Sequence, residues 1–300
     1  MNTLPTISLL PLLACIVGGA QTQEPFQLSV NVNLVLLNAT VRDRNGTPVT
    51  DLSEQDFEVH EDGVKQDIRL FKREDTPVTV GLVVDHSGSM RHKLASVVAA
   101  ARSFVQSSNP QDQMFVVNFN EKVTLGLPNE IRFTNRVEDL SFAIANSPTE
   151  GMTALYDAVF LGRNHLQDAS FNKKVLIVIS DGSDNASKHK LSEVVKMAQQ
   201  STILVYAIGV FGEEDRNPDV LRRLTGITGG EAFFPQKLDE VVAICERIAR
   251  DIRSQYTIGY TSTNQGTTNA FRTIRLAARS ASKGRLSVRT RAGYIAGGPK

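Results

Sequence analysis

Between residues 77 and 255, short runs of apolar residues alternate with longer segments that carry apolar residues on one helical face. Mostly apolar runs, as in strands covered on both faces, occupy 78–84, 114–119, 175–180 and 203–210, and the first of them is nearly continuous in β-branched residues. Segments with the three- and four-residue spacing of amphipathic helices include 94–105, 137–146, 154–166, 191–200 and 238–254. This alternation predicts an α/β fold with a doubly wound, mostly parallel sheet and helices on both faces.

The segments on either side of this region alternate apolar and polar residues with the period of a strand. Asn45-Gly46 and Glu61-Asp62-Gly63 are turn signals between the N-terminal strands, and alternation returns over 256–260, 271–276 and 286–291. Three strands alone would be marginally stable. We therefore expect residues 256–300 to pack with residues 21–76 in one small β unit beside a domain spanning 77–255.

Residues 1–20 contain no charged side chain and end in two glycines and an alanine, followed at once by polar sequence. Their apolar stretch is too short for a stable membrane span, so we interpret them as a signal peptide. The mature chain is then exported, to the periplasm, the cell surface or the medium, without a transmembrane segment. An apolar N-terminal strand and lipidation at Cys15 are the alternatives.

Composition changes this picture little. The chain has 300 residues, 41% of them hydrophobic, and 33 basic residues stand against 32 acidic ones, so no charge excess favours a nucleic-acid partner. Only Cys15 and Cys245 are present, and removal of a signal peptide would leave no internal disulfide. Cys245 shares a helical face with Val241 and Ile248, so we expect it to be buried.

Oxygen-bearing side chains follow two of the buried strands and precede a helix. The first strand leads into Asp85-His86-Ser87-Gly88-Ser89, the third ends in Ser180-Asp181-Gly182, and Thr153 comes just before a helix. The carboxyl ends of parallel strands meet at one edge of a sheet, where ligands bind. This edge thus offers oxygen ligands for a divalent cation: Asp85, Ser87, Ser89, Thr153 and Asp181. Mg²⁺ suits this set best, although Mn²⁺ and Ca²⁺ also accept it.

Asp-x-Ser-x-Ser, a later Thr before a helix, and Asp-Gly after a buried strand together resemble the metal-ion-dependent adhesion site of von Willebrand type A domains. The resemblance covers about residues 77–255. It implies that Ser87, Ser89 and Thr153 bind the ion directly or through water. Asp85 and Asp181 would hold it largely without direct coordination, through the groups that contact it. It also implies a protein partner that offers Asp or Glu to the metal.

The chain departs from the family motif at one position, and the resemblance extends beyond residues 77–255. Met152 stands where many relatives have glycine, which makes the Thr153 loop the least typical part of the motif. The flanking segments 41–49, 56–63 and 289–294 are similar to those of a bacterial family of exported A-domain proteins. That family supplies no defined partner.

Other interpretations of these residues remain open. Asp85 to Ser89 could serve as a helix cap. His86 is expected to face solvent at the rim of the site. Asp184 and Asn185 are expected to shape a turn. A hydrolase is the rival function, yet Ser87 lacks the Gly-x-Ser-x-Gly pattern, and its neighbour His86 should point away from it. We therefore predict a non-enzymatic, metal-dependent protein-binding module, with a structural ion as the second alternative.

Overall fold

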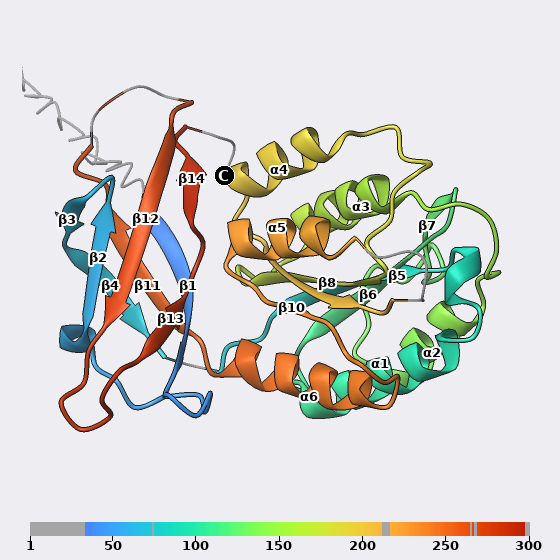
Figure 1. Ribbon diagram of the computed structural model, residues 1–300, viewed down its shortest axis with the longest axis horizontal. Helices are drawn as coiled ribbons and strands as arrows, with labels where there is room; N and C mark the ends of the chain where they lie inside the picture. The colour runs from blue at the N-terminus through green and yellow to red at the C-terminus, as the bar shows by residue number, and fades with distance from the viewer. Residues whose placement is uncertain (1–33, 74, 212–216, 265, 267–268, 298–300) are drawn as a thin grey trace, which may run out of the picture. The chain divides into compact units, whose positions relative to one another are not determined.

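The computed structural model describes residues 34–297 except 74, 212–216, 265 and 267–268 (Figure 1). The expected signal peptide (residues 1–20) and the first part of the expected N-terminal β segment (residues 21–33) lie outside the described residues. No helix in the described ranges is both long and apolar enough to cross a membrane.

A six-stranded sheet forms the centre of the region from residue 79 to residue 253. Its strands lie in the order β10-β9-β8-β5-β6-β7, and every neighbouring pair is parallel except β6 and β7. The strands are β5 (Thr79–Asp85), β6 (Gln113–Phe119), β7 (Val123–Leu125), β8 (Lys174–Ser180), β9 (Leu204–Gly209) and β10 (Ala232–Phe233). This arrangement confirms the doubly wound, mostly parallel sheet.

Helices cover both faces of this sheet, with α1 and α6 on one face and α3, α4 and α5 on the other (Figure 1). The helices are α1 (Leu94–Ser107), α2 (Val137–Ala145), α3 (Leu155–Gln167), α4 (Leu191–Gln200), α5 (Pro218–Thr228) and α6 (Glu240–Arg253), with short 3₁₀ turns η1 (Glu54–Asp56) and η2 (Gly88–Met90). The apolar faces seen in the sequence therefore point toward the sheet, and most predicted bounds differ from these by one or two residues.

The middle of the sheet is packed too tightly for a side chain at one position. A Cβ atom on Gly81 in β5 would lie 2.4 Å from the Phe115 ring and 2.7 Å from Leu176. Gly162 in α3 also faces Leu176, at 3.1 Å. Strand β5 is buried along its whole length, which fixes the position of its carboxyl end.

Two antiparallel sheets form the β unit, and strands from both ends of the chain pair within each. Their orders are β13-β1-β11-β4 and β14-β12-β2-β3. The strands are β1 (Leu34–Arg42), β2 (Phe57–Glu61), β3 (Val64–Gln66), β4 (Ile68–Lys72), β11 (Tyr256–Thr261), β12 (Phe271–Ala278), β13 (Ser287–Arg289) and β14 (Gly293–Ile295). Both sheets contribute to one apolar core, so the β unit predicted from the two flanks is confirmed.

The last strand was not foreseen. The alternation over 286–291 predicts one strand, but the chain instead leaves β13, which pairs with β1, and forms β14, which pairs with β12 in the other sheet. A Cβ on Gly293 would lie 2.3 Å from the carbonyl oxygen of Arg272. A glycine therefore permits the close backbone approach with which β14 begins.

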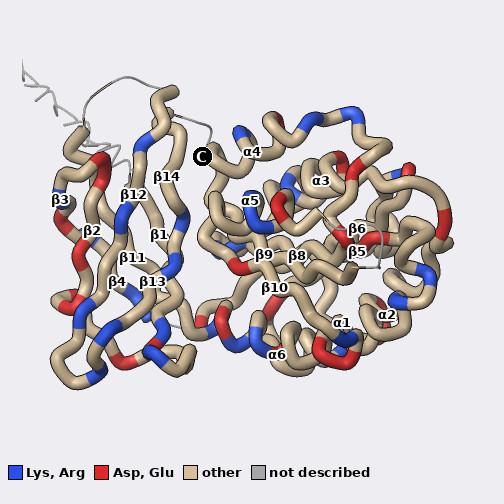
Figure 2. Tube along the Cα trace, viewed as in Figure 1, with Lys and Arg blue, Asp and Glu red and all other residues tan. Residues whose placement is uncertain are grey.

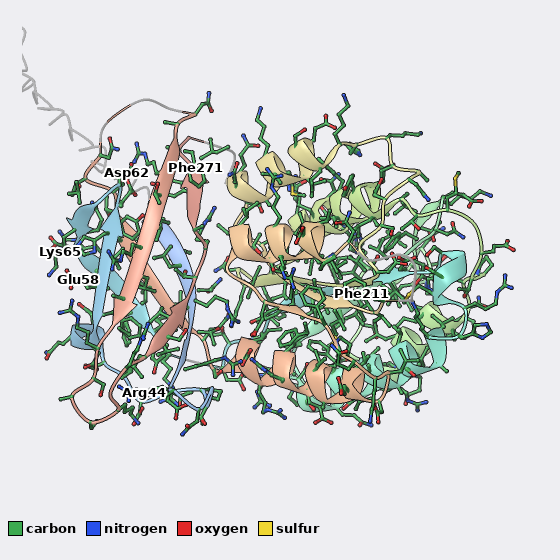
Figure 3. The ribbon with its side chains drawn as sticks, viewed as in Figure 1. Arg44, Glu58, Asp62, Lys65, Phe211 and Phe271 are labelled. Atoms are coloured by element: carbon green, nitrogen blue, oxygen red, sulfur yellow. The ribbon has the colours of Figure 1, made fainter. Side chains whose placement is uncertain are left out.

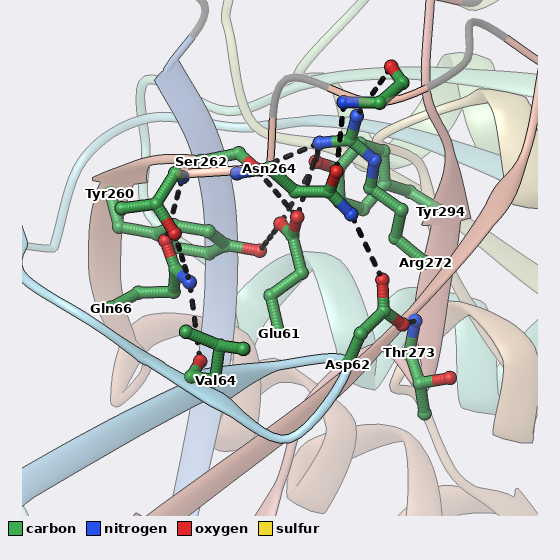
Figure 4. A network of polar contacts seen from close by, with 12 residues as sticks. Glu61, Asp62, Val64, Gln66, Tyr260, Ser262, Asn264, Arg272, Thr273 and Tyr294 are labelled. Carbon is green, nitrogen blue, oxygen red and sulfur yellow. Dashed lines mark hydrogen bonds and ion pairs between the residues drawn. The ribbon is translucent and has the colours of Figure 1, made fainter.

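A buried polar network links the two sheets at one end (Figure 4). The Glu61 carboxylate is fully buried and lies 3.1 Å from Nη1 of Arg272. It also accepts hydrogen bonds from the hydroxyls of Tyr260 (2.7 Å) and Tyr294 (3.0 Å). A buried charge is tolerated when it is paired and hydrogen-bonded in this way. Glu58 and Lys65, by contrast, lie at the outer margin of the β unit (Figure 3).

Candidate metal centre

The candidate ligands gather at the carboxyl ends of β5 and β8. Asp85 is the last residue of β5, and Asp181 directly follows β8, which is the parallel neighbour of β5. The chain runs outward from β5 in both directions, so this edge is the topological switch point where ligands bind in open α/β sheets. The structure therefore places the two carboxylates where the sequence predicts them.

Hydrogen bonds connect four of the five predicted residues. The Asp85 carboxylate accepts the backbone N–H of Ser87 at 2.8 Å. The hydroxyl oxygens of Ser87 and Ser89 lie 3.1 Å apart, and the Ser89 hydroxyl donates to Asp181 Oδ2 at 2.7 Å. Ser87 stands at the N-cap of η2 but makes no side-chain cap bond, so its hydroxyl faces the other candidate ligands rather than the helix.

Thr153, the fifth candidate, is held at this edge through its backbone. Its N–H donates to Oδ1 of Asn185 at 2.8 Å, and its carbonyl accepts the N–H of Asn185 at 2.9 Å. The loop meets the serine loop where Gly88 N–H donates to the Gly151 carbonyl at 3.3 Å. The Thr153 hydroxyl makes no hydrogen bond with the other four candidates in the described chain.

The two carboxylates are buried without a cationic partner. Asp85 is 0% exposed and Asp181 is 2% exposed, and neither forms an ion pair with another described residue. Burial raises the pKa of the Asp85 carboxyl to about 6; hydrogen bonds from Ser180 and Ser87 oppose this shift and Asp181 adds to it. Two buried acids that form no ion pair with a described residue favour a bound cation.

The centre is open toward solvent on one side. Ser87 and Thr153 are buried, whereas Ser89 is exposed and the neighbouring Met152 is 52% exposed. Within the described ranges, no three His, Cys, Asp or Glu side chains gather as a ligand cluster. A metal ion here would therefore rely on hydroxyls together with the two acids, which suits a hard cation that keeps bound waters.

The expected position of His86 is wrong. Its side chain is 0% exposed, and its Nε2 lies 3.0 Å from Oδ1 of Asn118, whose amide in turn donates to Ala143 in α2. Successive side chains of an extended segment point to opposite sides. Asp85 and Ser87 therefore face the candidate site while His86 points into the packing against α2, where burial lowers its pKa.

Three residues support the site that the sequence did not single out for this purpose. Ser180 donates to Oδ2 of Asp85 at 2.6 Å, Glu121 accepts the N–H of Met152 at 2.9 Å, and Asn185 holds Thr153. Asn185 was expected to shape a turn only. Its position four residues after Asp181 is the one feature of the sequence that could have indicated a role of Asn185 at the site. Its partner Thr153, however, lies 32 residues away along the chain.

The family model of the von Willebrand factor type A domain matches residues 79–247, more than half of the chain. The chain therefore belongs to the von Willebrand factor type A (VWA) domain family, whose members generally act as modules that bind other proteins.

Individual relatives are distant. Inter-alpha-trypsin inhibitor heavy chain H2 of Mus musculus is 27% identical over 168 residues, which are 52% of this chain and 18% of that protein. A von Willebrand factor type A structure from Catenulispora acidiphila has a TM-score of 0.52 and 13% identity, covering 89% of this chain and 75% of that one. The VWA-type domain of the type V pili tip protein Mfa5 from Porphyromonas gingivalis has a TM-score of 0.48 and 14% identity, covering 59% and 95%. At 13% identity the Catenulispora acidiphila structure shows the fold alone.

Proposed function

We propose that this chain is a metal-dependent protein-binding module in which a divalent cation, Mg²⁺ in the first place, accepts an acidic side chain of a partner protein. The observation that carries the proposal is the pair of buried carboxylates, Asp85 and Asp181, which have no cationic partner in the described chain. The module is proposed to act outside the cytoplasm, as the apolar N-terminal segment suggests.

The residues at the sheet edge fit such an ion. The hydroxyls of Ser87, Ser89 and Thr153 would hold it directly or through water, and Asp85 and Asp181 would balance its charge. When bound, the ion supplies an electrophilic position that attracts a carboxylate. Ser89 is exposed, so this position opens to solvent where a partner can reach it.

The rival interpretations have less support. A hydrolase would need a base beside Ser87, but His86 is fully buried and its Nε2 is engaged with Asn118. A structural ion would need no opening to solvent, whereas the exposure of Ser89 and Met152 provides one. Protein binding is therefore the function that the geometry favours.

Calorimetric titration of the chelator-stripped, full chain with Mg²⁺, Mn²⁺ and Ca²⁺ tests the metal site. We expect saturable binding of one ion, weakened at least about tenfold in Ser87→Ala/Ser89→Ala, because hydroxyl ligands are lost. Ser183→Ala is the matched control, since it removes a neighbouring hydroxyl outside the candidate set. Equal affinities of all three proteins would refute the site.

A second measurement separates an accessible ion from a structural one. In proton NMR, with protein in excess over Mn²⁺, the methyl protons of added acetate should relax faster than in a control sample. The control contains the double-alanine variant and a Mn²⁺ complex that has no free coordination position. This follows if the acetate carboxylate reaches the bound ion. Saturable metal binding with no acetate effect would favour the structural ion instead.

A further inference from the structure

A hollow of about 390 Å³ lies where α6 ends, at the edge of the sheet opposite to the candidate metal centre. Asp75, one of its lining residues, comes shortly before β5, whose other end carries Asp85. The lining residues are Pro48, Thr50, Arg73, Asp75, Arg250, Arg253 and Ser254. Three guanidinium groups thus converge on a hollow that contains one carboxylate.

The positive charge of this hollow is only partly compensated. Nε of Arg253 pairs with Asp75 Oδ2 at 2.7 Å. Arg250 lies 3.9 Å from Glu246, a long contact between exposed side chains. Arg73 makes no hydrogen bond or ion pair with another described residue. The nearby Asp51 is already paired with Lys283 at 2.8 Å, so it does not neutralise Arg73 fully.

The C-terminus of α6 does not supply the missing negative charge. Its carbonyl groups would attract cations if they were free. However, the Ile252 carbonyl accepts the Lys173 ammonium group, and the carbonyls of Arg250 and Asp251 accept the backbone N–H of Ser254. These carbonyls already have donors, and Lys173 adds further positive charge on this side of the molecule.

The net charge of the chain is only +1, and both signs of charge occur along much of the trace, although residues 252–300 contain no Asp or Glu (Figure 2). Like charges that converge repel one another unless an anion lies between them. Guanidinium groups present planar pairs of donors that match the oxygens of phosphate and carboxylate. The hydroxyl of Thr50 adds a neutral donor at the same place, whereas the Ser254 hydroxyl already donates to the Asp251 carbonyl.

We propose that this hollow binds an oxyanion with two negative charges, of the chemical class of a phosphate group. The guanidinium groups of Arg73 and Arg250, which are only partly neutralised, would balance the two charges. The hollow is larger than a phosphate ion, so a phosphate monoester fits as well as the free ion. The site is separate from the metal centre and does not depend on a bound cation.

Calorimetric titration of the full chain with inorganic phosphate and with glycerol 3-phosphate tests the proposal. Chelator must be removed by gel filtration and no divalent cation added, because a polyanionic chelator would compete and a bound metal would attract phosphate itself. We expect saturable one-to-one binding, weakened about tenfold by Arg73→Gln or Arg250→Gln, since a charge-assisted hydrogen bond is lost. Arg69→Gln, an exposed arginine on β4 outside the hollow, is the matched control and should bind as the wild type does.

Each outcome decides the matter. Similar affinities for the two ligands mean that the hollow recognises the phosphate group alone, and tighter binding of the ester means that it also contacts the attached group; both support the site. Absence of saturable binding by the folded wild type overturns the proposal. So does equal weakening by Arg69→Gln, because binding would then follow overall charge.

Discussion

At the scale of single residues, Asn185 shows what a sequence motif leaves out. The motif predicts Thr153 as a ligand, but the position of this threonine depends on a residue from another loop that bonds both sides of its backbone. Such a contact joins segments 32 residues apart, and no spacing along the chain reveals it. The position of the candidate ligands at one sheet edge could thus be predicted from the sequence, whereas the residues that hold them there could not.

Replacement of Asn185 by alanine tests this positioning role. We expect Asn185→Ala to weaken Mg²⁺ binding about 10- to 100-fold, as outer partners of metal ligands commonly do. The fold should persist, since the two backbone bonds to the Thr153 carbonyl do not need the side chain. Calorimetric titration with Mg²⁺ would measure the affinity. Asn164→Ala, at an exposed asparagine on α3, is the control. Unchanged affinity in Asn185→Ala would show that the Asn185 side chain does not position Thr153 for the metal.

Lys173 gives a residue-scale prediction about pH. Burial lowers its pKa from 10.5 to about 8, although Asp112 and Asp75 oppose the shift. The folded chain then releases this proton near pH 8, while the unfolded chain keeps it until near 10.5. Lys173 therefore contributes a free energy of unfolding that increases with pH between these two values.

The comparison of wild type with Lys173→Met isolates this contribution. Burial also raises the pKa of the Cys245 thiol to about 12, which reduces stability above the ordinary thiol pKa in both proteins and cancels in the difference. In urea unfolding, the wild type should gain stability relative to the variant from about pH 7.5 to about pH 9.5. Lys174→Met controls for loss of a lysine. A difference that stays flat or declines with pH would contradict the prediction.

At the scale of elements, the sequence predicts those parts whose own residues determine their structure. The buried β-branched runs and the helical apolar faces correspond to strands and helices close to the predicted bounds. The strand β14 was missed because its three residues form a strand only by pairing with β12 across the β unit. His86 was misplaced for a similar reason, since the packing of α2 decides which side of the strand end is buried.

The close packing of β5 against side chains of its neighbours β6 and β8 yields a prediction at this scale. Gly81→Ala should cost about 1–3 kcal/mol, because the new methyl group would overlap the Phe115 ring and Leu176 in a close-packed core. Gly226→Ala is the matched control: its Cβ would meet nothing within 4 Å in α5, so it should stabilise by about 0.5–1 kcal/mol through helix propensity. Thermal unfolding of both variants measures the contrast. A Gly81→Ala protein as stable as the wild type would show that this core can relax.

At the scale of the whole molecule, β1 of the β unit and α6 of the VWA domain are joined by a buried ion pair. Nη2 of Arg42 donates to both carboxylate oxygens of Asp251, at 2.6 and 2.5 Å. Gln255, between α6 and β11, donates to Thr40 in β1 and to Tyr206 in β9, each at 3.3 Å. Buried polar contacts of this kind are lost together if the two parts separate, so we expect the parts to unfold in one transition.

Loss of one charge at this junction should therefore affect both parts. Asp251→Asn removes the carboxylate closest to the buried Arg42 guanidinium and leaves only Glu231, 4.0 Å away. Removal of one member of a buried pair costs about 3–5 kcal/mol. Asp219→Asn makes the same chemical change at an exposed pair with Arg222 and should cost less than about 1 kcal/mol. Calorimetric unfolding should show one transition for the wild type and a lower midpoint for Asp251→Asn. If the midpoint of Asp251→Asn matched that of Asp219→Asn, the ion pair would not stabilise the junction, and the β unit would be held to the VWA domain by apolar packing alone.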